Sequence, residues 1–116
     1  MTGDDLAGLL ERDEVAVLDV RSRAEYEGET GYPCDPRQGH IPGAAHLDLN
    51  EIYGAGGDPA VVRALLAERG VPEGRPVVAY CHSGQRSELA AALLRQAEID
   101  AVNYAGSWHE WSRRSG

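Results

Sequence analysis

Short, nearly continuous apolar runs alternate with amphipathic stretches along the chain. Such an apolar run is typical of a parallel strand that is covered on both faces, because neither face meets water. Stretches whose apolar residues recur every three or four positions predict helices between these runs. The alternation predicts an α/β fold, with a central, mainly parallel sheet of roughly four or five strands and helices on both faces. We expect strands at residues 15–20, 44–47, 76–80 and 101–104, and helices at residues 2–11, 59–69 and 87–97.

Capping residues mark the ends of these helices. Thr2 is expected to cap the first helix, Asp58 the second and Ser87 the third, while Gly70 ends the second. Short helical turns are expected after residue 22 and around Trp111, whereas residues 50–57 are predicted to be irregular. The buried sides of the two longer helices are predicted to be Val61, Val62, Leu65 and Leu66, and Leu89, Ala90, Leu93, Leu94 and Ala97.

Length and charge restrict the possible functions. A chain of 116 residues predicts a single domain, residues 1–116, with one core. The net charge of −8 makes nucleic acid and anionic membrane surfaces poor partners. The chain has neither an apolar run long enough to span a bilayer nor the pattern of a signal peptide at its first residues, so we expect a cytoplasmic protein.

The two cysteines, Cys34 and Cys81, do not form a disulfide framework. A reducing compartment suits a working thiolate. The four histidines and two cysteines show no zinc-binding spacing along the chain, so we expect neither a metal nor another cofactor.

Cys81 stands where a predicted strand runs through a short polar loop into a helix. Such a loop directs backbone N–H groups and the positive end of a helix dipole at one point, which lowers the pKa of a cysteine there. The pattern therefore predicts a nucleophile that faces an anion-binding cradle. Arg86 is expected either to hold an anionic donor or to pin the loop through a carboxylate. The expected substrate-binding residues are His82, Ser83, Gly84, Gln85, Arg86 and Ser87. Of these, His82, Ser83 and Gln85 are expected to contribute mostly backbone N–H groups, with side chains that face the substrate and set its identity.

Several motifs together resemble the rhodanese sulfurtransferases. Cys81 and Arg86 are separated by four residues, which resembles the active-site loop of that family. The other motifs are Asp19-Val20-Arg21 followed by Glu25-Tyr26, Gly39-His40-Ile41-Pro42-Gly43-Ala44, and Tyr104-x-Gly-Ser-Trp-x-Glu-Trp111. The resemblance covers essentially the whole chain and is greatest to the C-terminal catalytic domain of two-domain thiosulfate and 3-mercaptopyruvate sulfurtransferases. It implies a three-layer sandwich.

The resemblance also implies a chemistry. Cys81 would take the outer sulfur of thiosulfate or a related small anionic donor as a persulfide, then pass it to cyanide or a thiol. Asp19 and Arg21 are expected to brace the loop through a buried ion pair or hydrogen bonds. Glu25 stands where some relatives carry a donor-gripping arginine, a role that Arg23 or Arg37 could take instead.

Alternatives remain open at this point. Cysteine phosphatases and arsenate reductases of related fold use a similar cradle with five intervening residues, and some rhodanese modules bind partners without catalysis. The chain could also be the second half of a two-domain enzyme. Cys34 is expected to be an inert loop residue, although it could instead resolve the Cys81 persulfide as a disulfide. His40 is expected to bond backbone near the type II turn at Pro42-Gly43, and Trp108 and Trp111 are expected in the core.

Overall fold

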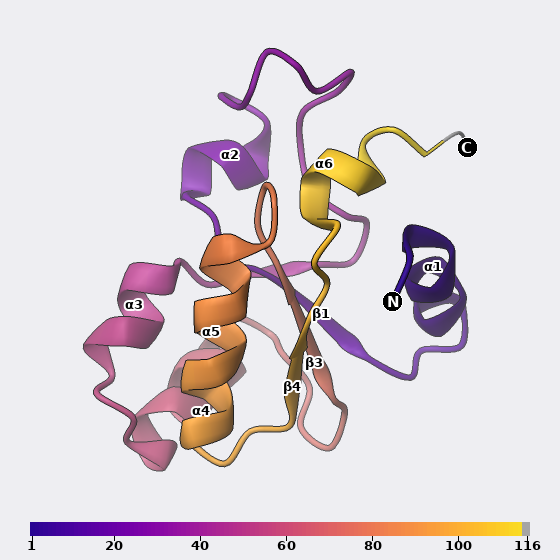
Figure 1. Cartoon of the computed structure of the whole chain (residues 1–116). Coiled ribbons are helices and arrows are strands. Elements are labelled where there is room, and N and C mark those ends of the chain that lie inside the picture. The colour runs from indigo at the N-terminus through magenta and orange to yellow at the C-terminus, as the bar shows by residue number, and fades with distance from the viewer. Residues whose placement is uncertain (115–116) are drawn as a thin grey trace.

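The computed structural model of the chain describes residues 1–114 and shows a sheet of four parallel strands. The strands are β1 (Ala16–Asp19), β2 (Ala45–His46), β3 (Val77–Tyr80) and β4 (Ala101–Asn103). Their order across the sheet is β2-β1-β3-β4, so β1 and β3 are the inner strands (Figure 1). This confirms the predicted parallel sheet.

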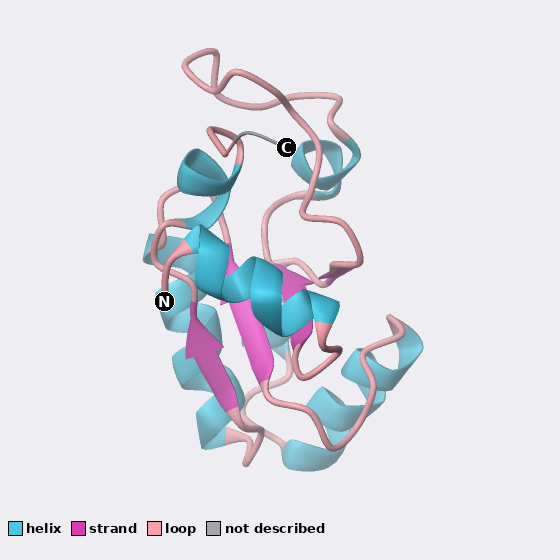
Figure 2. Ribbon diagram, turned by 90° about the vertical axis from the view of Figure 1, so that its right-hand side faces the viewer, coloured by secondary structure: helices cyan, strands magenta, loops and turns pink. Residues whose placement is uncertain are grey.

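Helices cover both faces of the sheet and complete three layers. One face carries α3 (Leu49–Gly54), α4 (Pro59–Glu68) and α5 (Gln85–Gln96). The other face carries α1 (Gly3–Glu11) and α6 (Ser107–Trp111), and Figure 2 shows α1 lying across the strands. The short helix α2 (Arg23–Glu27) follows β1 beyond the carboxyl end of the sheet (Figure 1). Within residues 1–114, no helix combines the length and the apolar character that crossing a membrane would need.

Alternate residues of the inner strands feed two separate cores. Leu18 and Ala79 join the core beneath α3, α4 and α5, whereas Val17 and Val78 join the core beneath α1 and α6. Successive strand residues point to opposite faces, so an unbroken apolar run fills both cores at once. Trp108 and Trp111 lie in the second core, as predicted.

One helix was not predicted, and one helix start was predicted wrongly. Residues 49–54 form a helix rather than irregular chain, because the Asp48 carboxylate accepts a hydrogen bond from the Asn50 N–H at 2.8 Å and Ile52 is buried. The sequence pattern for this helix was weak because Ile52 is its only fully buried residue. Helix α5 begins at Gln85, with Gly84 rather than Ser87 at its cap position.

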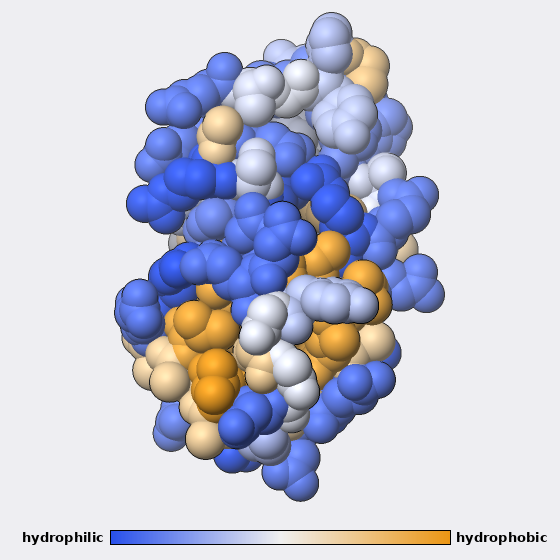
Figure 3. All heavy atoms as spheres, turned by 90° about the vertical axis from the view of Figure 1, so that its left-hand side faces the viewer, coloured by the Kyte–Doolittle hydropathy of each residue, from blue (hydrophilic) through white to orange (hydrophobic). Residues whose placement is uncertain are grey.

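Val61 and Leu89 are exposed, at 44% and 43%, although both were predicted to be buried. Helix α4 uses Val62 and Leu66, and α5 uses Ala90, Ala91 and Leu94, so each helix presents a narrower stripe to the sheet than its apolar content suggested. Apolar side chains consequently reach the surface on the face of the molecule shown in Figure 3.

The turn at Pro42-Gly43 is formed as expected. The Ala44 N–H donates to the Ile41 carbonyl at 3.0 Å, and Gly43 has a φ of +83°. A positive φ at the third position of the turn is the type II signature, and glycine adopts it without strain. The turn returns the chain to the start of β2.

Candidate active site

Cys81 directly follows β3, at the carboxyl end of an inner strand. Ligand sites of open parallel sheets lie at this end, where loops converge above the strands. The residue is 1% exposed and packs under α5, so its thiol is shielded from bulk water.

The thiol sulfur receives several hydrogen bonds. The Gly84 N–H donates to Cys81 Sγ at 3.1 Å, and Ser87 Oγ lies 3.3 Å from it. Burial by itself raises the pKa of the Cys81 thiol. Hydrogen bonds from the Ser87 hydroxyl and from the N–H groups of Ser87, Gly84 and Ser83 outweigh burial, so the pKa is lowered overall. This confirms the predicted stabilisation of the thiolate.

Asn103 is a residue of the site that sequence reasoning missed. It ends β4, the neighbour of β3, and its Oδ1 lies 2.6 Å from Ser87 Oγ while its amide donates to the Gly84 carbonyl at 3.1 Å. It thus orients both groups that contact the sulfur. The available signal was a polar residue at the carboxyl end of a predicted strand.

The loop that carries Cys81 is held from behind by α6. Ser107 Oγ accepts from the Cys81 N–H at 3.1 Å, and the Trp108 N–H donates to the Cys81 carbonyl at 2.9 Å. Gly84 has a φ of +97°, and a Cβ there would lie 2.6 Å from the Ala105 carbonyl oxygen. Only glycine fits this close approach.

Arg86 pairs with Glu25 of α2. Two parallel hydrogen bonds of 2.9 and 3.1 Å join the guanidinium to the carboxylate. Burial raises the pKa of Glu25, but Arg86 and the Ser22 cap lower it further, to about 2. Of the two roles expected for Arg86, these contacts match the pinning of the loop through a carboxylate.

Asp19 and Arg21 form the expected buried ion pair, 2.8 Å between Arg21 Nη2 and Asp19 Oδ2. The Tyr80 hydroxyl donates to the same carboxylate at 2.7 Å, and Arg21 also donates to the Gly39 carbonyl. The pair therefore joins β1, β3 and the chain before the Pro42-Gly43 turn. Its contacts are structural and lie beside Tyr80 rather than at the thiol.

The remaining loop side chains turn away from the sulfur. The His82 ring stacks on Tyr32 at 3.7 Å between centroids and lies 3.0 Å from Asp35. Ser83 and Gln85 are exposed and bond to each other. Of these three residues, Ser83 contributes a backbone N–H that lowers the pKa of Cys81, as expected. The His82 side chain, which was expected to face the substrate, contacts Tyr32 and Asp35 instead.

The other candidates have structural contacts. His40 stacks on Tyr26 and bonds the Tyr26 carbonyl at 2.8 Å, so its backbone partner lies in α2 and not near the turn. Arg23 pairs with Glu27 at 3.2 Å, and Arg37 donates to the Trp111 carbonyl at 3.0 Å. The prediction that one of these arginines grips a donor gains no support from these contacts. Cys34 is exposed, and both cysteines are free thiols.

A hollow of about 510 Å³ lies at the opposite end of the sheet, lined by Pro76 and Val77 at the start of β3 and by Asp100 before β4. None of the residues that line it is a cysteine, and Cys81 lies beyond the far end of the same strand. Its size therefore says nothing about the chemistry.

Comparison with known proteins gives a consistent result. The model of the rhodanese-like domain matches residues 2–114. The thiosulfate sulfurtransferase of Azotobacter vinelandii is 34% identical over an alignment of 118 positions that covers 93% of this chain and 41% of that enzyme. The 3-mercaptopyruvate sulfurtransferase of Escherichia coli K12 is 32% identical over 85% of this chain and 37% of its own length. The chain thus spans well under half the length of these relatives.

Among solved structures, a human single-domain sulfurtransferase superposes with a TM-score of 0.70 at 28% identity. The match covers 100% of this chain and 96% of the human one. The same fold therefore occurs both as part of longer relatives and as a chain of this length.

Proposed function

The chain belongs to the rhodanese-like domain family, and from this premise we propose that it is a sulfurtransferase that carries sulfane sulfur on Cys81. The observation that carries the proposal is the thiol of Cys81, whose pKa is lowered by hydrogen bonds from Ser87 and Gly84 at the start of α5. A thiolate is the reactive form of cysteine as a nucleophile.

In the first half-reaction, the Cys81 thiolate attacks the outer sulfur of thiosulfate. A new S–S bond forms, the old S–S bond breaks, and sulfite leaves with the electron pair, so that Cys81 becomes a persulfide. A small donor suits a thiol that is 1% exposed, because only its outer sulfur has to enter the cradle.

In the second half-reaction, cyanide or a thiolate attacks the terminal sulfur of the persulfide. The acceptor leaves as thiocyanate or as a persulfide, and the Cys81 thiolate is regenerated. The same N–H groups stabilise negative charge on the cysteine sulfur before and after transfer, and on the terminal sulfur between the two steps. Two half-reactions through one covalent intermediate predict ping-pong kinetics.

Arg86 is proposed to act through position. Its pairing with Glu25 fixes the first turn of α5, and with it the Ser87 hydroxyl that contacts the sulfur. A phosphatase would instead need its arginine to bind the equatorial oxygens of a phosphoryl group. The pairing with Glu25 therefore favours sulfur over phosphorus, as does the loop of four intervening residues.

The test is the covalent intermediate itself. Incubation with thiosulfate should add a single sulfur, about 32 Da by mass spectrometry, as expected for a persulfide from nucleophilic catalysis. The variant Cys81→Ser should lose both the adduct and thiocyanate formation, whereas Cys34→Ser should retain both. An adduct that survives in Cys81→Ser would refute the proposal.

A further inference from the structure

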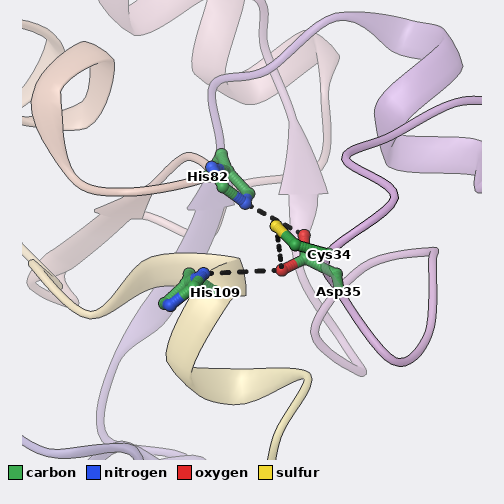
Figure 4. A group of neighbouring side chains, drawn as sticks. All are labelled: Cys34, Asp35, His82 and His109. Carbon is green, nitrogen blue, oxygen red and sulfur yellow. Dashed lines mark hydrogen bonds and ion pairs between the residues drawn. The ribbon is translucent and has the colours of Figure 1, made fainter.

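Four potential metal-ligand side chains meet beside the active-site loop. Cys34 and Asp35 come from the loop between α2 and β2, His82 from the active-site loop, and His109 from α6 (Figure 4). One ligand atom from each residue can be chosen so that all four lie within 4.8 Å of one another. Asp35 is at the centre, with Oδ2 3.0 Å from His82 Nε2, and Oδ1 3.5 Å from His109 Nδ1 and 3.9 Å from Cys34 Sγ.

The Asp35 carboxylate is buried, and one of its two oxygens has no hydrogen-bond partner within residues 1–114. Its side chain is 0% exposed, and within residues 1–114 its Oδ2 atom has no hydrogen-bond partner, nor does His82 Nε2. These two atoms face each other at a close distance, yet their geometry does not make a hydrogen bond. Buried polar atoms nearly always have a hydrogen-bond partner, so this oxygen and nitrogen, which meet as an ion pair without hydrogen-bond geometry, mark a place suited to a ligand that binds both.

We propose that Cys34, Asp35, His82 and His109 form a binding site for a divalent transition-metal ion of the zinc class. One thiolate, one carboxylate and two imidazoles are borderline ligands that suit Zn²⁺ and do not suit Ca²⁺ or Mg²⁺, which take oxygen ligands. Zinc bonds of roughly 2.0–2.3 Å in a tetrahedron place ligand atoms about 3.3–3.8 Å apart. Side-chain rotations that bring the most distant ligand atoms about 1 Å closer together would give the separations of a tetrahedral zinc site.

Neighbouring residues already orient these ligands. The Tyr32 ring stacks on His82, and the His109 N–H donates to the His82 carbonyl at 2.9 Å. Arg113 donates to Asp35 Oδ1 at 2.9 Å and to the Cys34 carbonyl at 2.8 Å, which leaves Oδ2 free. Groups that hold the first ligands in place in this way are a regular feature of metal sites.

The positive charge of Arg113 works against a dication, but two features limit its effect. The Arg113 side chain is 38% exposed, so water screens its charge. The Cys34 thiolate and the Asp35 carboxylate supply two negative charges that balance the ion. The site therefore goes beyond sulfur transfer: it would tie the loop of Cys34, the active-site loop and α6 together, and it needs no contribution from Cys81.

The experiment uses Co²⁺, which reports thiolate ligation by a charge-transfer absorption, with Zn²⁺ as the displacing ion. The parent protein and Cys81→Ser should each bind one Co²⁺ with this absorption, because the nucleophile is not a ligand. Adding Cys34→Ser to the Cys81→Ser protein should abolish the absorption. His109→Ala should weaken Co²⁺ binding at least about tenfold, as loss of a group at a metal site does. His40→Ala, a histidine outside the cluster, should leave it unchanged.

Two results would overturn the site. If Cys81→Ser alone loses the absorption, Cys81 is the thiolate ligand of Co²⁺ and the proposed site is wrong. If the parent protein binds no Co²⁺, the four side chains form only a cluster of ion pairs. Circular dichroism of each variant separates lost binding from lost folding, and His109→Ala tests the site even if Cys34→Ser does not fold. Because Cys81→Ser is incapable of the proposed sulfur transfer, a failure of the metal site and a failure of the sulfurtransferase proposal are distinguishable.

Discussion

At the scale of single residues, the Ser87 hydroxyl has one hydrogen and two acceptors within reach. Cys81 Sγ lies 3.3 Å away and Asn103 Oδ1 lies 2.6 Å away. A hydroxyl donates only one hydrogen bond at a time, so its direction depends on the charge of the sulfur. A bond to a thiolate is charge-assisted and about twice as strong as a neutral one, so ionisation of Cys81 favours donation to the sulfur.

Replacement of this hydroxyl should therefore slow the reaction of the Cys81 thiol with an alkylating reagent. In Ser87→Ala the pKa of Cys81 rises towards that of an ordinary thiol, because one of the groups that lower it is gone. Loss of a hydrogen bond to a charged group costs about 1.5 kcal/mol, which corresponds to a roughly tenfold loss of reactivity near neutral pH. The measurement is the rate of alkylation by iodoacetamide as a function of pH.

The matched control is Ser112→Ala, which removes a buried hydroxyl bonded to the His109 carbonyl outside the active-site loop. Its alkylation profile should coincide with that of the parent. An unshifted profile in Ser87→Ala would show that backbone N–H groups alone stabilise the thiolate.

At the scale of elements, α2 and α5 are joined by the pair between Glu25 and Arg86. The two residues are 61 positions apart, and a capping interaction with Ser22 fixes the carboxylate at the start of α2. The short helix α2 has no fully buried residue of its own. Its position beyond the carboxyl end of the sheet therefore depends on such contacts, which include the bond from the Tyr26 hydroxyl to the Ala44 carbonyl.

Glu25→Gln should lower the free energy of unfolding by about 1 kcal/mol at neutral pH. The effect is no larger because the Arg86 side chain is 36% exposed and water weakens its attraction to Glu25. The pKa of Glu25 is about 2 in the folded protein against an ordinary 4.5. A lowered carboxyl pKa stabilises the fold above pH 4.5, and this stabilisation is lost as the pH falls towards 2. Urea unfolding of parent and variant should therefore differ most at neutral pH and converge in acid.

Glu27→Gln is the control for this experiment. It removes one charge of an exposed pair with Arg23 and should change the free energy of unfolding by less than about 0.5 kcal/mol. A difference between Glu25→Gln and the parent that does not shrink below pH 4.5 would contradict the assigned pKa of Glu25.

At the scale of the whole molecule, the buried group of Asp19, Arg21 and Tyr80 joins the two inner strands to the segment that leads into β2. The Tyr80 hydroxyl donates to Asp19 and accepts from the Ile41 N–H at 3.0 Å. All three side chains are at most 1% exposed. A buried ion pair of this kind adds little net stability when intact, but breaking it leaves a charge in the core.

Asp19→Asn should accordingly lower the free energy of unfolding by about 3–5 kcal/mol, because Arg21 keeps its charge and loses its counter-ion. Urea unfolding monitored by tryptophan fluorescence gives the value. Asp13→Asn, which removes a charge from the exposed pair with Arg75, should cost less than about 0.5 kcal/mol. If Asp19→Asn does not fold, Tyr80→Phe is the test, and it should lower the free energy of unfolding by about 1–2 kcal/mol through loss of two hydrogen bonds. Equal stability of Tyr80→Phe and the parent would contradict the role of this buried group in joining the strands.

The sequence by itself determined the parallel sheet, most helix positions and the place of Cys81 in the loop between a strand and a helix. These features depend on local signals: an apolar run marks each strand, and Thr2 and Asp58 cap their helices as predicted. Cys81 was found because strand, loop and helix are adjacent in the chain. Where the local signal was faint, as in the single buried turn of α3, the prediction was wrong.

Only the tertiary structure decided which residues share a site. Asn103 reaches Ser87 because β4 lies beside β3 in the sheet, and Glu25 reaches Arg86 because the loops after β1 and β3 open at the same edge. The carboxyl ends of parallel strands gather side chains that are distant in sequence. Periodicity and spacing describe neighbours along the chain, so they could not show that Cys34 and Asp35 lie beside His82 and His109. The spacing of histidines and cysteines along the chain had argued against a metal site.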